Sequence, residues 1–65
     1  MDLRFKFKFK FDAEAFVMAA EQECFDTSWG RLGLYVEVYR VDKIDIDEVI
    51  ELAHEQFGEL IQDET

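Results

Sequence analysis

Two segments of the chain alternate between apolar and polar residues, as a half-buried β-strand does. From Leu3 to Phe11 every second residue is apolar, and the residues between them are Arg4 and three lysines. From Leu32 to Val41 the alternation returns with smaller aliphatic residues. Because successive side chains of a strand point to opposite faces, the pattern predicts two long strands, each with one buried face.

Two further segments repeat their apolar residues at intervals of three and four, which is the period of an α-helix. The first covers about Ala13–Phe25, with Asp12 placed to cap its N-terminus. The second covers about Ile46–Gln62, with Asp45 and Glu48 spaced as a capping box. We therefore predict one helix after each long strand.

The segment between the first helix and the second long strand is rich in turn residues. Gly30-Arg31 suits a two-residue hairpin turn, which makes Thr27–Trp29 a short strand, although these residues also fit a plain loop. With the short strand, a right-handed crossover places it parallel to the first strand, with the other long strand antiparallel between them. Without it, a sheet of two strands requires a dimer that continues it.

These elements predict an α+β fold. Its order is β-α-(β)-β-α, a two-layer sandwich with a small antiparallel sheet and two helices on one face. At 65 residues the chain is expected to form a single domain, 1–65, near the lower size limit for one hydrophobic core, which leaves a homodimer open. Apolar residues make up 49% of the chain, which is too many for a disordered protein despite a net charge of −9.

The sequence carries no signal peptide and no apolar run long enough to span a bilayer, so we expect a soluble cytoplasmic protein. Its one cysteine, Cys24, excludes an internal disulfide and belongs to the apolar stripe of the first predicted helix, where a buried thiol is inert. His54, the one histidine, lies on a helix flank.

Catalytic and metal-binding motifs are absent from the sequence. It has no Gly-rich phosphate loop and no Cys/His spacing for zinc. Asp42, Asp45 and Asp47 alternate like calcium ligands, but the glycine and the terminal glutamate of a calcium loop are missing. We expect neither an enzyme nor a cofactor or metal site.

Negative charge is concentrated on the second predicted helix, opposite its apolar stripe. Helix-dipole stabilisation explains the acids of the first turn, but not those that follow. Glu51, Glu55, Glu59 and Asp63 form like-charge i, i+4 pairs, each costing about 0.2–0.5 kcal/mol, with no Lys or Arg among them. A solvated surface is one explanation. A binding partner with the opposite charge is the other.

We predict a partner-binding surface of seven carboxylates on the two helices: Glu48, Glu51, Glu55, Glu59, Asp63, Glu21 and Glu23. Acids four residues apart are spaced by ~6 Å along a helix. Phosphates follow one another every ~3.4 Å along one DNA strand, so the neighbouring helix is needed to approach that density. The expected partner is a basic nucleic-acid-binding protein or nuclease complex, whereas free nucleic acid and anionic membranes are repelled.

The polar face of the strands offers a second interpretation. It carries five basic and aromatic residues: Lys6, Lys8, Lys10, Tyr35 and Tyr39. Such a face is typical of single-strand binders that stack bases on aromatic rings, or of a sheet-to-sheet dimer. The net charge argues against the first use. Pairing of the lysines with Tyr and Glu of the neighbouring strand explains them internally.

In size, in charge and in its acidic ending GELIQDET, the chain resembles the small acidic phage proteins that inhibit host defence nucleases, including anti-CRISPR proteins that mimic DNA. The resemblance implies a viral inhibitor, acting in the host cytoplasm, that blocks the DNA-binding channel of a CRISPR or other defence nuclease complex. The basic strand RFKFKFKF departs from that class, and its regularity also resembles designed sheets. The alternative is a structural or homodimeric α+β module with no nucleic-acid-related activity.

Overall fold

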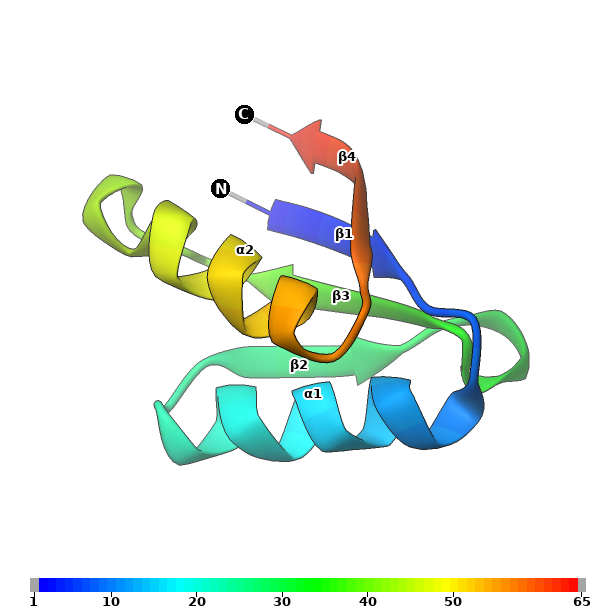
Figure 1. Cartoon of the computed structure of the whole chain (residues 1–65). Coiled ribbons are helices and arrows are strands. Elements are labelled where there is room, and N and C mark those ends of the chain that lie inside the picture. The colour runs from blue at the N-terminus through cyan, green and yellow to red at the C-terminus, as the bar shows by residue number, and fades with distance from the viewer. Residues whose placement is uncertain (1, 65) are drawn as a thin grey trace.

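The protein is described by a computed structural model that covers residues 2–64, and its side chains are described at positions 2–30 and 32–61. The elements are β1 (Asp2–Lys6), α1 (Lys10–Gln22), β2 (Asp26–Trp29), β3 (Tyr35–Tyr39), α2 (Ile46–Glu55) and β4 (Glu59–Glu64). Two short 3-10 turns, η1 (Arg31–Gly33) and η2 (Lys43–Asp45), precede β3 and α2. The fold is α+β, with a four-stranded antiparallel sheet and two helices (Figure 1).

The strands lie in the order β2-β3-β1-β4, and each neighbouring pair is antiparallel. β2 is therefore parallel to β1 with β3 between them, as the predicted right-handed crossover requires. The short strand over Thr27–Trp29 is confirmed as part of β2. With β4 added, the element order β-α-β-β-α-β is the ferredoxin-like one, and the chain itself supplies the four described strands of the sheet.

Aromatic side chains form the centre of the core between the sheet and the helices. Phe5 and Phe7 are at most 1% exposed, and Phe16 of α1 packs on both, with ring centroids 5.2 Å and 5.3 Å away. Val49 and Ala53 of α2 belong to the same buried cluster. Both helices thus contribute side chains to the apolar face of the sheet.

The first strand is shorter than its alternation predicts. β1 ends at Lys6 and α1 begins at Lys10, so the prediction of one strand as far as Phe11 was wrong. Asp12, predicted as the N-cap, lies inside the first turn of α1, where the helix dipole still favours it. Phe9 takes the N-cap position, and Phe9 and Phe11 are 55% and 69% exposed instead of buried.

The second helix is also shorter than predicted. It ends at Glu55 instead of continuing to about Gln62, and the last part of the chain forms β4 beside β1. Phe57 has φ 62° and Gly58 donates its N–H to the carbonyl oxygen of Ala53 at 2.7 Å. This is the Schellman arrangement that closes a helix C-terminus.

The connection between β2 and β3 is longer than the predicted two-residue turn at Gly30-Arg31. It includes η1, in which Leu32 (φ 58°) and Gly33 (φ 72°) are both left-handed. Leu32 is 80% exposed, so this turn projects from the sheet without adding to the core.

Cys24 terminates α1 in the same manner as Phe57 terminates α2. It has φ 65°, its N–H donates to Glu21, and the N–H of Phe25 donates to Ala20. The prediction that Cys24 is buried was wrong, because the left-handed position turns its side chain into solvent.

We expect Cys24→Gly to raise the free energy of unfolding by about 1 kcal/mol. Relief of left-handed strain contributes about 1–2 kcal/mol, and the greater freedom of glycine in the unfolded chain offsets about 0.5–1 kcal/mol of it. Urea denaturation followed by circular dichroism measures the change. Cys24→Ala is the matched control, since it removes the thiol but keeps the strain, and an equal gain from it would contradict this explanation.

Candidate acidic interface

Five of the predicted contact residues lie exposed on or next to the helices. Glu48, Glu51 and Glu55 belong to α2, Glu21 lies in the last turn of α1, and Glu23 is its C-cap. We refer to these five residues as the helical acids. α1 and α2 contact each other and run in opposite directions, so α1 ends at the end of the molecule where α2 begins (Figure 1).

The other two predicted contact residues lie on β4, so the prediction of an acidic row continuing along one helix was wrong. Glu59 is directly opposite Lys6 in the β1–β4 register, and both line a small hollow. Opposite charges across a strand pair stabilise a sheet by about 0.2–1 kcal/mol. Asp63 is paired with Leu3 through the backbone, and its side chain lies outside the described residues.

Within the described residues, the two ion pairs leave the helical acids unengaged. Arg4 Nη2 lies 3.4 Å from Glu37 Oε1, and these two residues face each other across β1 and β3. Arg40 pairs with Asp26 and also donates its backbone N–H to Asp2. The described cations that form ion pairs therefore neutralise acids of the strands and not those of the helices.

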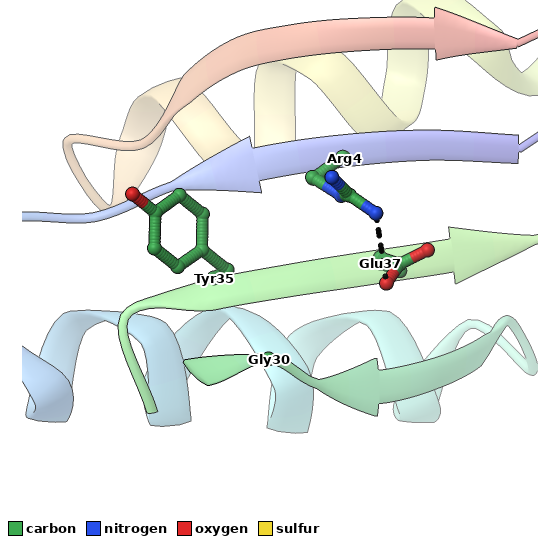
Figure 2. A pocket seen from close by; sticks show the side chains of 4 residues that line it. All are labelled: Arg4, Gly30, Tyr35 and Glu37. Atoms are coloured by element: carbon green, nitrogen blue, oxygen red, sulfur yellow. Dashed lines mark ion pairs between the residues drawn. The ribbon is translucent and has the colours of Figure 1, made fainter. Parts of the chain in front are cut away.

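The polar face of the sheet has internal partners for its cations. Figure 2 looks onto this face with both helices behind it, and shows Arg4 reaching toward Glu37. Lys6 Nζ lies 6.0 Å from the ring centroid of Tyr35, within reach of a cation–π interaction. The predicted pairing of lysines across the long strands does not extend to Lys8 and Lys10, which lie beyond the end of β1.

The same face is slightly hollowed next to the β2–β3 connection. Arg4, Gly30, Tyr35 and Glu37 line a pocket of about 360 Å³ (Figure 2). Among the described lining residues Arg4 is the one cation, and it is already paired with Glu37, so the pocket offers little to hold a phosphate backbone. The geometry therefore gives less support to a single-strand binding surface than to the helical acids.

No group of three or more His, Cys, Asp or Glu side chains in the described part of the chain could hold a metal ion. His54 is in the last turn of α2 and Cys24 follows the last turn of α1. Because the helices run in opposite directions, the two residues lie at opposite ends of the helix pair (Figure 1). Among the described residues, no helix is long and apolar enough to cross a membrane.

No protein-family model, no curated protein and no solved structure matches the chain.

A second exposed surface was missed from the sequence. Phe9 and Phe11 were expected in the core and Phe57 in a helical stripe, but all three line an open groove of about 610 Å³. The signal that could have found it is Gly58, since a glycine after an apolar stripe is a helix stop signal. Because α2 stops at Glu55, Phe57 lies in the connection to β4 and is exposed.

Proposed function

We propose that the chain is an acidic inhibitor whose helical acids take the place of nucleic-acid phosphates in the DNA-binding channel of a nuclease complex. The observation that supports this is that five exposed carboxylates on α1 and α2 have no cation at ion-pair distance among the described residues. Like charges gathered in this way repel one another, and the Lys and Arg residues of a basic channel would offset that repulsion.

The spacing along α2 fits this role. Glu48, Glu51 and Glu55 follow one another at about 4.5 Å and 6 Å along the axis, from ~1.5 Å per residue. One DNA strand carries a phosphate every ~3.4 Å, so α2 presents somewhat more than half of that density. Glu21 and Glu23 add charge at the end where α2 begins. Glu59 leaves the contact set because it lies on β4, opposite Lys6 in the strand register, and not on a helix.

The partner in this proposal is a basic nucleic-acid-binding protein, with a CRISPR effector or another defence nuclease as the first candidate. The chain itself does not contact nucleic acid, since its net charge of −9 repels it. The encounter is expected in the host cytoplasm, as for the phage inhibitors that the chain resembles. Association is steered by charge, so it is fast at low salt and weakens as salt rises.

The test is DNA binding by purified CRISPR effectors and other defence nucleases, measured by fluorescence polarisation of a labelled duplex with increasing amounts of the chain. The wild-type chain should displace DNA from at least one of them. The triple variant Glu48→Gln, Glu51→Gln, Glu55→Gln should require on the order of tenfold more protein, because charge steering accounts for about 10- to 1,000-fold in association rate.

A matched control changes net charge equally at other positions. Glu14→Gln, Asp42→Asn and Glu59→Gln remove three exposed charges outside the helical acids, and inhibition should be retained. Equal loss in both triple variants would show that overall charge matters and the α2 surface does not. If the wild-type chain displaces DNA from none of the nucleases, the mimicry is wrong and the structural module is favoured.

A further inference from the structure

An apolar groove lies where α1 begins and α2 ends. Phe9, Phe11 and Phe57 are 55%, 69% and 77% exposed and line the groove of about 610 Å³, which we call the aromatic groove. The rings of Phe9 and Phe11 are stacked, with centroids 5.5 Å apart and an interplanar angle of 13°. A contiguous apolar patch of this kind marks an interaction surface.

The charges around the aromatic groove balance one another. Lys8 and Asp12 line it, and the adjoining hollow, which also includes Lys8, adds Lys6 and Glu59. Among the described residues, the rim therefore holds two ammonium groups, two carboxylate groups and the His54 imidazole, in a chain whose net charge is −9. Two copies of the chain repel each other where acids dominate, but this patch carries no excess of like charge.

The partner that binds the aromatic groove should therefore carry positive and negative groups in equal number, as the groove rim does. Two-fold symmetry sets the same patch on both sides of an interface, so cations and carboxylates of one copy can meet carboxylates and cations of the other. A strongly basic or strongly acidic partner would leave half of these groups opposed by like charge.

The apolar area is sufficient for a reversible contact. A phenylalanine presents about 150–250 Å² when fully exposed, so the three rings offer roughly 400 Å² in each copy. That is about half of the ~800 Å² that each partner contributes to a stable complex, and the polar rim supplies part of the remainder. The contact is therefore smaller than that of a stable complex, and we expect it to be reversible.

We propose that a second copy of the chain occupies the aromatic groove, forming a symmetric dimer with groove against groove. α1 begins and α2 ends at this contact, so Glu21, Glu23 and Glu48 lie at the opposite end of each copy (Figure 1). The dimer thus leaves these acids exposed in both copies. It does not depend on the inhibitory role proposed above.

Sedimentation velocity of the full chain from about 1 μM to 1 mM tests the dimer. The mass should rise from 7.7 kDa toward twice that value as concentration rises. Phe57→Gly should raise the dissociation constant by about tenfold or more, because exposed aromatic residues at the centre of a contact dominate its strength. The fold is kept in this variant, since Phe57 has φ 62° and glycine is favoured there.

Ile44→Ser is the matched control, because Ile44 is 88% exposed in η2, away from the groove. This variant should show the same rise in mass with concentration as the wild type. Added salt should strengthen the dimer by screening the acidic bodies, whereas it weakens the proposed nuclease complex. A mass of 7.7 kDa up to 1 mM at high salt overturns the dimer. Equal weakening of the dimer by Ile44→Ser and by Phe57→Gly would also overturn it. Neither result tests whether the chain displaces DNA from a nuclease.

Discussion

Phe16→Ala should lower the free energy of unfolding by about 3–5 kcal/mol, a large part of the stability of the fold. The Phe16 side chain is fully buried and lies 5.2 Å and 5.3 Å from the rings of Phe5 and Phe7, so its removal leaves a cavity under the centre of the sheet. Truncation of a buried phenylalanine costs about 3–5 kcal/mol. A domain of this size has about 3–10 kcal/mol in total, at about 0.05–0.15 kcal/mol per residue.

Urea denaturation followed by circular dichroism, with the amide proton spectrum as a second measure of folding, checks this result. Phe11→Ala is the matched control, because Phe11 belongs to the same helix but is 69% exposed. At a concentration below that of any dimer, the control should change the free energy of unfolding by no more than about 0.5 kcal/mol. Similar losses in the two variants would contradict the observed assignment of the core.

Gly58→Ala should be the next most damaging substitution, with a loss of about 3 kcal/mol. An added Cβ would lie 2.4 Å from Cε2 and 2.6 Å from Cζ of Phe7, and 3.0 Å from the carbonyl oxygen of Ala53. Phe7 is 1% exposed and packs on Phe16, so its ring cannot move aside without disturbing the core. Overpacking of this kind costs about 1–3 kcal/mol, and a backbone shift away from Phe7 that weakens the hydrogen bond from the residue 58 N–H to Ala53 adds to it.

The urea midpoint of Gly58→Ala measures this cost, and Phe7→Leu tests its cause. If the clash with the Phe7 ring is responsible, Gly58→Ala should cost less in the Phe7→Leu background than in the wild type. Glu59→Ala, next along the chain but exposed, should cost no more than about 1 kcal/mol, the contribution of its cross-strand pairing with Lys6. A wild-type midpoint for Gly58→Ala would mean that the chain does not pass over Phe7 on its way into β4.

The alternation of the first strand predicted which of its side chains point into the core, but it did not predict where the strand ends. Leu3, Phe5 and Phe7 are buried as expected, whereas Phe9 and Phe11 are not. A period of two identifies which side chains share a face, but it does not say where the chain must turn. Here the strand ends early because α1 has to cross back over the sheet, where Phe16 packs on the rings of Phe5 and Phe7.

The end of α2 could not be read from the sequence because the helical stripe continues into residues that form β4. Leu60 falls on the helical stripe, yet it reaches the same core from β4. The usual glycine stop was displaced by one residue, since Phe57 takes the left-handed position and Gly58 follows it. The like-charge pair Glu55/Glu59 was the physical sign of the stop, because ending the helix at Glu55 removes that repulsion.

The candidate acids could be predicted wherever the helix itself was predicted correctly. Glu48, Glu51 and Glu55 lie opposite the apolar stripe of α2, and the stripe fixes their exposure. Glu59 depends on pairing with a strand more than fifty residues earlier, at Lys6, which local periodicity does not encode. The aromatic groove forms where the start of α1 meets the end of α2. These two helix ends are far apart in the sequence, so the local pattern alone could not place the groove.

The pairing of β4 with β1 has a mechanical consequence. Asp2 faces Glu64 across this ladder, so β1 begins beside the end of β4 (Figure 1). The hydrogen bonds of an antiparallel pair run perpendicular to the strands. Tension applied between the two ends would therefore load these bonds one after another, and β4 would unzip from the sheet at low force instead of resisting as a unit.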